Sequence, residues 1–217
     1  MGKRGTAIEA TSSFQSARAA LLSVLKELSY EEREVTLSSG QKSHFYIDCK
    51  QTVLTGEGHV LVGMCFHELL GRAENLHPNA ALPQHAACGG LTMGADPLCS
   101  SLALWATMNG RELNAIYVRK EPKGHGTGAY LEGVKAVPPG SRVVVLEDVV
   151  TTGNASLTAA RRLREGGYVV DTVLTLVDRE AGGREALAKE GLWLSALYSL
   201  QDLPVPGAAS GKSGGSA

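Results

Sequence analysis

The 217-residue chain lacks the marks of several classes of protein. Its four cysteines form no CxxC pair and show no metal-ligand spacing, and three of them lie in apolar runs, where reduced cysteine behaves as a small hydrophobe. The formal net charge is only -1, which gives no reason to expect binding to nucleic acid or to a membrane. No apolar run is long enough to span a bilayer, and residues 1–13 contain no secretory signal. We therefore expect a cytoplasmic protein with reduced cysteines.

The composition indicates one globular domain between two polar ends. Hydrophobic residues make up 43% and charged residues 20% of the chain, and the length suits a single α/β domain. Residues 1–11 are polar, and residues 204–217, PVPGAASGKSGGSA, are rich in glycine, serine and proline. Such segments bury too little surface to offset the entropy of ordering. The sequence predicts disorder at both ends and a single domain over residues 12–203.

Helix and strand signals alternate between these ends. Helices are expected where apolar residues recur at spacings of three and four, and strands where short apolar runs are bounded by turns. The expected helices run from a cap at Ser12 or Ser13 to Leu28 and over 58–70, 97–108 and 154–164; the expected strands cover 86–88, 115–118, 143–146 and 171–177, after a strand-like stretch at 35–48. This alternation predicts an α/β fold with a mostly parallel sheet, which binds ligands at the carboxyl ends of its strands.

The most informative stretch is VVVLEDVVTTGNAS, residues 143–156. A buried strand ends in two carboxylates, Glu147 and Asp148, and a turn of two threonines and Gly153 opens a helix. The amino end of a helix offers free N–H donors and a positive dipole to a phosphate. The two acids are spaced to meet the hydroxyls of a ribose whose 5′-phosphate lies in the turn. The alternative is a plain strand-turn-helix with a threonine cap and two solvated acids.

A basic, glycine-rich loop, RKEPKGHGTGAYLEG, covers residues 119–133. It places Arg119, Lys120, Lys123 and His125 among four glycines. Such a loop suits a mobile lid that closes over a polyanion, excludes water and stabilises the charge of a leaving group. A solvated basic surface loop is the alternative reading of the same residues.

These two segments resemble a known family. The strand, paired acids, two apolar residues and TTG are similar to the PRPP-binding motif of type I phosphoribosyltransferases, and the lid pattern resembles that of orotate phosphoribosyltransferases in particular. The resemblance implies the type I fold with a small N-terminal hood-like segment. It makes Lys123 and Asp148 catalytic and assigns PRPP binding to Arg119, Lys120, Lys123, His125, Glu147, Asp148, Val149, Val150, Thr151, Thr152, Gly153, Asn154 and Ala155. Two departures are the glutamate at 147, where many members have aspartate, and Pro122 in place of alanine.

Three further segments fit the same resemblance. It implies that residues 39–50, SGQKSHFYIDCK, line the orotate pocket with Phe45 and Tyr46, and that Arg179 of VDREAGG (177–183) binds orotate's carboxylate together with Thr151. It also implies that GGLTMGADP (89–97) binds pyrophosphate through its backbone. Core packing of the aromatics and a surface salt bridge for Arg179 are the alternatives. Some members carry lysines where this chain has Ser38 and Gly89.

The resemblance implies an enzyme of pyrimidine biosynthesis that makes orotidine 5′-monophosphate from orotate and PRPP. It also implies a Mg²⁺ ion carried by the diphosphate, without a dedicated metal cage in the protein. The 119–133 loop would reach into the site of a second subunit, so a homodimer is expected. The alternatives are a purine phosphoribosyltransferase and a PRPP-sensing regulatory protein of the same fold.

Overall fold

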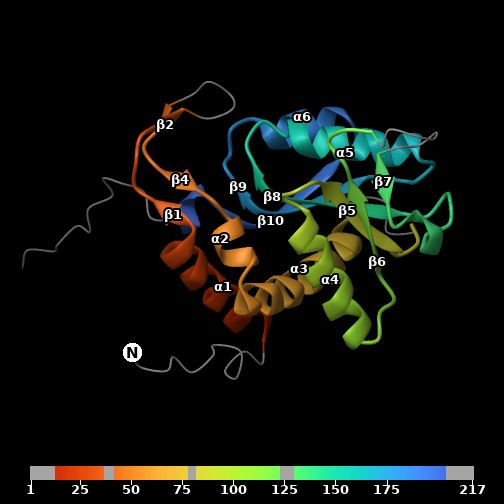
Figure 1. Cartoon of the computed structure of the whole chain (residues 1–217), viewed down its shortest axis with the longest axis horizontal. Helices are drawn as coiled ribbons and strands as arrows, with labels where there is room; N and C mark the ends of the chain where they lie inside the picture. The colour runs from red at the N-terminus through yellow and green to blue at the C-terminus, as the bar shows by residue number, and fades with distance from the viewer. Residues whose placement is uncertain (1–12, 37–41, 78–81, 123–129, 204–217) are drawn as a thin grey trace, which may run out of the picture.

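A six-stranded sheet runs through the middle of the molecule (Figure 1). The computed structural model describes residues 13–36, 42–77, 82–122 and 130–203. The strands lie in the order β10-β9-β8-β5-β6-β7, and every neighbouring pair is parallel except β6 with β7. Their bounds are β5 Ala87–Leu91, β6 Asn114–Val118, β7 Leu131–Glu132, β8 Val143–Val150, β9 Thr172–Asp178 and β10 Trp193–Ser199. The predicted α/β fold with a mostly parallel sheet is confirmed.

Helices cover both faces of the sheet (Figure 1). On one face lie α3 (Gly56–Leu76) and α4 (Asp96–Met108), with α1 (Phe14–Leu28) and the short α2 (Lys50–Val53) packed beside α3. On the other face lie α5 (Asn154–Glu165) and α6 (Gly183–Lys189). Two separate clusters of buried apolar side chains fill the spaces between sheet and helices. This is the three-layer arrangement that parallel strands require, because both faces of each central strand must be covered.

The helix ends follow from local hydrogen bonding. Ser13 caps α1 in a capping box with Ser16, as one of the two predicted caps, and Leu21 and Leu25 face the core four residues apart. Thr55 caps α3 by accepting a hydrogen bond from the N–H of Gly58 at 2.9 Å. That cap explains why α3 begins at Gly56, before the predicted start, and the helix continues to Leu76.

Strand β8 extends four residues beyond its predicted end at 146. Residues Val143 to Leu146 are fully buried, as expected of a strand covered on both faces. The ladder with β9 then continues through Glu147 and Val149 to Val150. The two candidate ribose acids therefore lie inside a strand, where the backbone fixes their directions.

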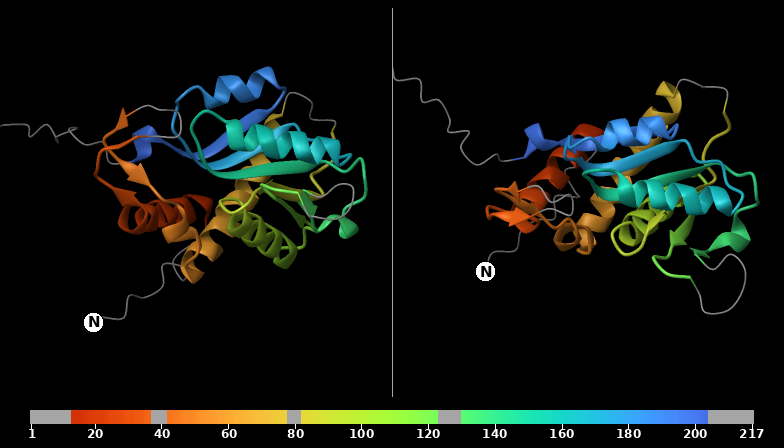
Figure 2. Two further views of the ribbon diagram at one scale, coloured as in Figure 1. Left: turned by 45° about the horizontal axis from the view of Figure 1, so that its top comes forward. Right: turned by 90° about the horizontal axis from the view of Figure 1, so that it is seen from above.

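The segment before α2 forms two small antiparallel sheets apart from the main sheet (Figure 2). Strand β1 (Tyr30–Glu31) pairs with β4 (Tyr46–Ile47), and β2 (Val35–Thr36) pairs with β3 (Lys42–Ser43). They correspond to the expected strand-like stretch over 35–48 and to the hood-like segment. Two single-turn 3-10 helices, η2 (Val134–Ala136) and η3 (Leu200–Asp202), complete the described elements. The expected disordered ends, 1–11 and 204–217, lie outside the described residues.

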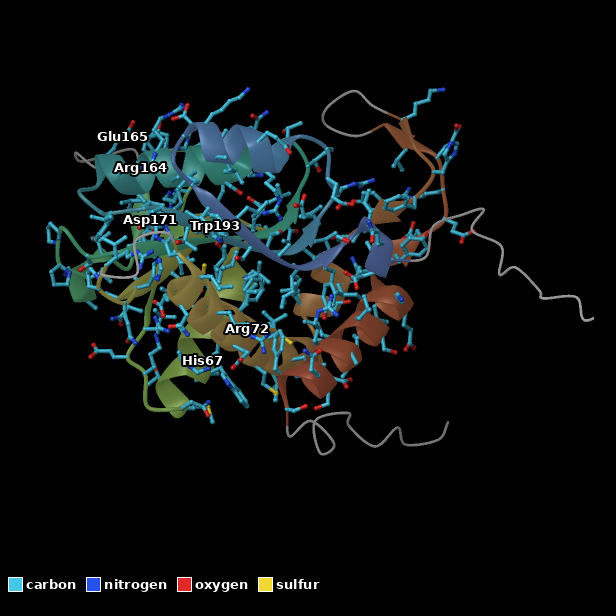
Figure 3. The ribbon with its side chains drawn as sticks, turned by 180° about the vertical axis from the view of Figure 1, so that it is seen from behind. His67, Arg72, Arg164, Glu165, Asp171 and Trp193 are labelled. Carbon is cyan, nitrogen blue, oxygen red and sulfur yellow. The ribbon has the colours of Figure 1, made fainter. Side chains whose placement is uncertain are left out.

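A cluster of charged side chains connects the amino ends of the strands, at the end of the sheet opposite to the carboxyl ends where ligands are expected. Glu74 of α3 accepts hydrogen bonds from Arg111 at 2.7 and 3.0 Å and from Nδ1 of His85 at 2.8 Å. Arg142 donates at 2.9 Å to each carboxylate oxygen of Asp171. Asp171, labelled in Figure 3, directly precedes β9. His85 lies between the two acids, with Nε2 at 3.7 Å from Asp171. The cluster joins chain segments that precede β5, β6, β8 and β9.

All four cysteines are buried and free, as expected of small hydrophobes. Within the part of the chain that the structure describes, no helix combines the length and apolarity needed to cross a membrane.

Candidate active site

The turn between β8 and α5 forms an open cradle at the carboxyl edge of the sheet. Gly153 precedes α5 with a φ of 82°, a conformation that suits glycine, and it has no side chain with which to cap the helix. The first N–H groups of α5 are therefore available to a ligand. A pocket of about 270 Å³ is lined here by Glu147, Val149, Val150, Thr151, Thr152, Gly153, Asn154, Ala155 and Ser156. Eight of these nine are predicted PRPP residues, so the structure brings them together.

Glu147 is the buried member of the acid pair. Its exposed fraction is 7%, so the alternative of two solvated acids is wrong for this residue. Burial and, after it, the neighbouring Asp148 carboxylate raise the pKa of Glu147 well above its ordinary value. Ser156, the ninth residue of the pocket, donates a hydrogen bond from Oγ to Glu147 at 3.3 Å. Sequence reasoning missed Ser156. The available signal was its place in the first turn of the helix that directly follows the strand of Glu147.

Asp148 lies against the loop between β5 and α4. One carboxylate oxygen accepts a hydrogen bond from the N–H of Val149 at 2.9 Å. A side-chain carbon added to Gly94 would lie 3.0 Å from that oxygen, so only glycine leaves the carboxylate its present space. The segment 89–97, predicted to bind pyrophosphate, therefore contacts one of the predicted ribose acids. The peptide bond between Thr92 and Met93 in this loop is cis.

Gly89, by contrast, lies inside β5 and not in the loop. A side chain there would meet the carbonyl oxygen of Ile116 at 2.7 Å, so this position cannot hold a lysine on the present backbone. Ser38, the other position at which the family resemblance suggested a lysine, lies outside the described residues.

Arg179 is buried beside the cradle. Its backbone N–H donates to the backbone carbonyl of Val150 at 2.9 Å, and this hydrogen bond joins the ends of β9 and β8. The exposed fraction of Arg179 is 8%, so the alternative of a surface salt bridge is wrong. Burial lowers the pKa of its guanidinium. A planar guanidinium matches a planar carboxylate in bidentate fashion.

The residues that follow Arg179 pack on the cradle itself. A carbon added to Gly183 would lie 2.7 Å from the carbonyl of Thr151 and 3.2 Å from the nitrogen of Gly153. The two motifs that sequence analysis treated separately, residues 143–156 and 177–183, are therefore in direct contact.

The two candidate aromatic residues have different neighbours. Phe45 lies with its ring centroid 4.6 Å from the guanidinium carbon of Arg179, stacks on Tyr30 at 5.8 Å and also packs against the apolar core. Tyr46 lies beneath the guanidinium of Arg33 at 4.4 Å. Phe45 thus combines core packing with contact to the candidate orotate arginine, while a role for Tyr46 stays a prediction.

The described residues at the start of the basic loop follow β6, which is two strands away from β8 in the sheet. Arg119 pairs with Glu132 at 3.3 Å, and Lys120 is exposed. Neither lines the 270 Å³ pocket. Lys123 and His125 lie outside the described residues, so their roles stay predictions.

Comparisons with known proteins agree with this arrangement. No family model matches the chain. The orotate phosphoribosyltransferase of Sorangium cellulosum is 44% identical over 187 residues, which cover 86% of this chain and 93% of that protein. The chain belongs to the orotate phosphoribosyltransferase family.

Solved structures show the same relationship. A crystal structure of orotate phosphoribosyltransferase from Mycobacterium tuberculosis in complex with Fe(III) dicitrate is 35% identical, with a TM-score of 0.72 over 87% of this chain and 99% of that one. The same enzyme in complex with PRPP is 34% identical, with a TM-score of 0.66 over 86% and 98%. The fold is that of the type I phosphoribosyltransferases, as the resemblance implied.

Lys50 is a cation near this orotate phosphoribosyltransferase site that sequence reasoning missed. Its Nζ lies 2.6 Å from Asp48, and it shares a cavity of about 230 Å³ with Met93 of the loop next to Asp148. The hydrogen bond to Asp48 and, to a smaller extent, the charge of Asp148 raise the pKa of Lys50. The available signal was its place at the end of the 39–50 segment that the family resemblance had already singled out.

Proposed function

We propose that the protein transfers the phosphoribosyl group of PRPP to orotate, giving orotidine 5′-monophosphate and pyrophosphate. The observation that carries this proposal is the place of Arg179, a buried residue whose backbone N–H donates to the carbonyl of Val150 in the strand that leads into the phosphate cradle. A carboxylate-bearing base and a sugar phosphate can then bind next to each other. Names of the relatives and the PRPP complex of one of them support the same reaction.

PRPP binding follows from the cradle. The 5′-phosphate accepts hydrogen bonds from the N–H groups at the start of α5 and from the hydroxyls of Thr151 and Thr152. The ribose hydroxyls bind Glu147 and Asp148, and these bonds offset part of the unfavourable charge on the buried acid. The loop at Gly94 then lies on the diphosphate side of the ribose, because it contacts Asp148.

Transfer exchanges one bond at the ribose anomeric carbon. Orotate's ring nitrogen forms a bond to this carbon and loses its proton, while the bond to the diphosphate oxygen breaks and pyrophosphate leaves with the electron pair. Arg179 holds the orotate carboxylate, and Phe45 packs beside that arginine. Arg119, Lys120, Lys123 and His125 neutralise the departing pyrophosphate, and Lys123 is the proposed catalytic cation. Catalysis then depends on positioning and charge stabilisation, without a covalent intermediate on the protein.

We also propose a Mg²⁺ ion bound with PRPP. The described residues contain no group of three or more His, Cys, Asp or Glu that could hold a metal ion by itself. Adjacent Glu147 and Asp148, one of them with a raised pKa, form a site where added positive charge is favourable. The residues therefore fit an ion that is held partly by diphosphate oxygens and that neutralises their charge.

Three broader proposals accompany the reaction. The protein acts in pyrimidine nucleotide synthesis, because its product is a pyrimidine nucleotide. It is a homodimer whose 119–133 loop serves the partner's site, which is in keeping with the separation of Arg119 and Lys120 from the cradle of their own chain. Its four free thiols favour a reducing compartment such as the cytoplasm.

Two other functions are less well supported. A purine base has no carboxylate for the guanidinium of Arg179 to bind. A regulatory protein that senses PRPP and binds nucleic acid would need a basic face, and the net charge of -1 provides no such excess.

The direct test is the loss of orotate absorbance when protein, orotate, PRPP and Mg²⁺ are mixed, beside a hypoxanthine control. We expect consumption of orotate only, dependent on PRPP. Lys123→Ala should lose most of kcat and unfold at nearly the wild-type temperature. Consumption of hypoxanthine instead would assign a purine enzyme, and an unimpaired Lys123→Ala would contradict the catalytic role of the loop.

A further inference from the structure

Arg162 lies in the third turn of α5, the helix whose first turn forms the phosphate cradle. Its guanidinium reaches to the chain that joins β6 and β7. Nη1 donates a short hydrogen bond to the carbonyl of Arg119, and Nη2 donates to the carbonyl of Lys120 at 3.1 Å. The guanidinium carbon also lies 4.1 Å from the ring centroid of Tyr130. One side chain therefore contacts the chain where it leaves β6 and where it returns to β7.

These contacts close the base of the 119–133 loop. The N–H of Arg119 donates to the carbonyl of Tyr130 at 2.7 Å, and its guanidinium pairs with Glu132 at 3.3 Å. Both ends of the loop thus bind each other and bind Arg162. Only a planar guanidinium can donate to two successive carbonyls and present its face to a ring at the same time.

We propose that Arg162 is a positioning residue for the transfer reaction. It fixes the backbone at Arg119 and Lys120, and so sets the direction from which these two cations meet the leaving pyrophosphate. It touches no substrate itself. This inference rests on the proposed function, which assigns Arg119 and Lys120 to pyrophosphate.

The role predicts a loss in kcat more than in KM. In Arg162→Gln, the amide can donate to only one of the two carbonyls and carries no charge over Tyr130. The cations are then misplaced when pyrophosphate departs, and we expect kcat to fall at least about tenfold, within the hundredfold that a misplaced group can cost. The KM for orotate should stay within about twofold, because Arg179 and the cradle are unchanged.

Arg161→Gln is the matched control. Arg161 is the preceding residue of the same helix, is exposed, and lines a pocket with Glu190 and Leu192. The same chemical change there should leave kcat at the wild-type value. Thermal unfolding of both variants checks the fold. If Arg162→Gln does not fold, Arg162→Lys is the second variant, because it keeps the aliphatic stem and the charge. It should show the same selective loss of kcat, because an ammonium lacks the planar pair of donors that a guanidinium offers to the two carbonyls.

A double-mutant cycle tests whether Arg162 acts through the two cations. In a background of Arg119→Ala with Lys120→Ala, adding Arg162→Gln should lower kcat by less than about twofold, because the groups that it positions are already absent. A full additional loss in that background, or an unimpaired single variant, would overturn the proposal. The wild-type rate separates the two proposals: a protein inactive with orotate contradicts the function, whereas an active one with unimpaired Arg162→Gln contradicts only the role of Arg162.

Discussion

Glu147 destabilises the folded protein because it is an acid buried in the site. It is buried beside Asp148, its pKa is raised, and its ionisation is therefore unfavourable in the folded state. We expect Glu147→Gln to stabilise the protein at neutral pH by about 0.5–2 kcal/mol, as other changes at strained functional positions do. The same variant should bind PRPP more weakly, since an amide is a poorer acceptor for ribose hydroxyls. Urea denaturation and PRPP titration measure the two effects.

The raised pKa of Glu147 determines how the stability difference between wild type and Glu147→Gln changes with pH. A raised pKa means that the folded state binds the proton more tightly than the unfolded state, so Glu147 lowers stability as pH rises above its unfolded pKa. The advantage of Glu147→Gln should therefore be absent in acid and grow towards neutral pH. Glu112→Gln, the same substitution at an exposed position, is the control for the chemical change itself. Equal stability of Glu147→Gln and wild type at every pH would mean that the acid is not strained.

For single residues, the sequence predicted local backbone arrangement better than it predicted burial. The sequence around Glu147, Asp148 and Gly153 was enough to predict a strand, a turn and a helix, because strand and helix geometry fix such local relations. The burial of Glu147 and Arg179 depends on chain segments far apart in sequence. No local pattern contains that information.

Among the elements, the contact between α6 and the β8–α5 turn determines the shape of the cradle. A carbon added to Gly183, the first residue of α6, would lie 2.5 Å from Val150 and 2.7 Å from the carbonyl of Thr151. We expect Gly183→Ala to displace the turn, raise the KM for PRPP about tenfold and destabilise the fold by about 1–3 kcal/mol, as overpacking does. Kinetics at saturating orotate and urea denaturation measure both.

Gly71→Ala provides the comparison for that substitution. Gly71 lies within α3, and an added carbon would meet nothing within 4 Å. The same substitution there should leave the KM unchanged and stabilise the protein by about 0.4–1 kcal/mol. An unchanged KM in Gly183→Ala would show that the turn does not hold the phosphate.

Elements with strong periodicity were predictable, and those defined by tertiary packing were not. The central strands are continuous apolar runs, so β8 and β9 were predicted within a few residues of their bounds. Sequence analysis missed β10, Trp193–Ser199, because apolar and polar residues mix along it and its pairing with β9 decides its conformation. It also missed the short α6, which begins at Gly183 directly after Gly182.

For the whole molecule, the charge cluster at the amino edge of the sheet should control stability in acid. Burial opposes ionisation of Glu74, but hydrogen bonds from His85 and Arg111 lower its pKa to about 2. A lowered pKa means that this stability is present above the unfolded pKa of about 4.3 and is lost as pH falls towards the folded value. Glu74→Gln should cost roughly 3 kcal/mol at pH 7, with the difference from wild type shrinking below about pH 4.

Glu68→Gln on the same helix tests whether this effect comes from the cluster. Glu68 pairs with Arg72 at 3.1 Å, but both side chains are about half exposed, so the pair should contribute about 0–1 kcal/mol. The cluster lies at the edge of the sheet opposite the cradle, and the activity per folded molecule should therefore be the same in both variants. Urea denaturation from pH 7 to pH 3 distinguishes the outcomes, since an equal, pH-independent cost for the two substitutions would mean that the cluster does not set the acid stability of the fold.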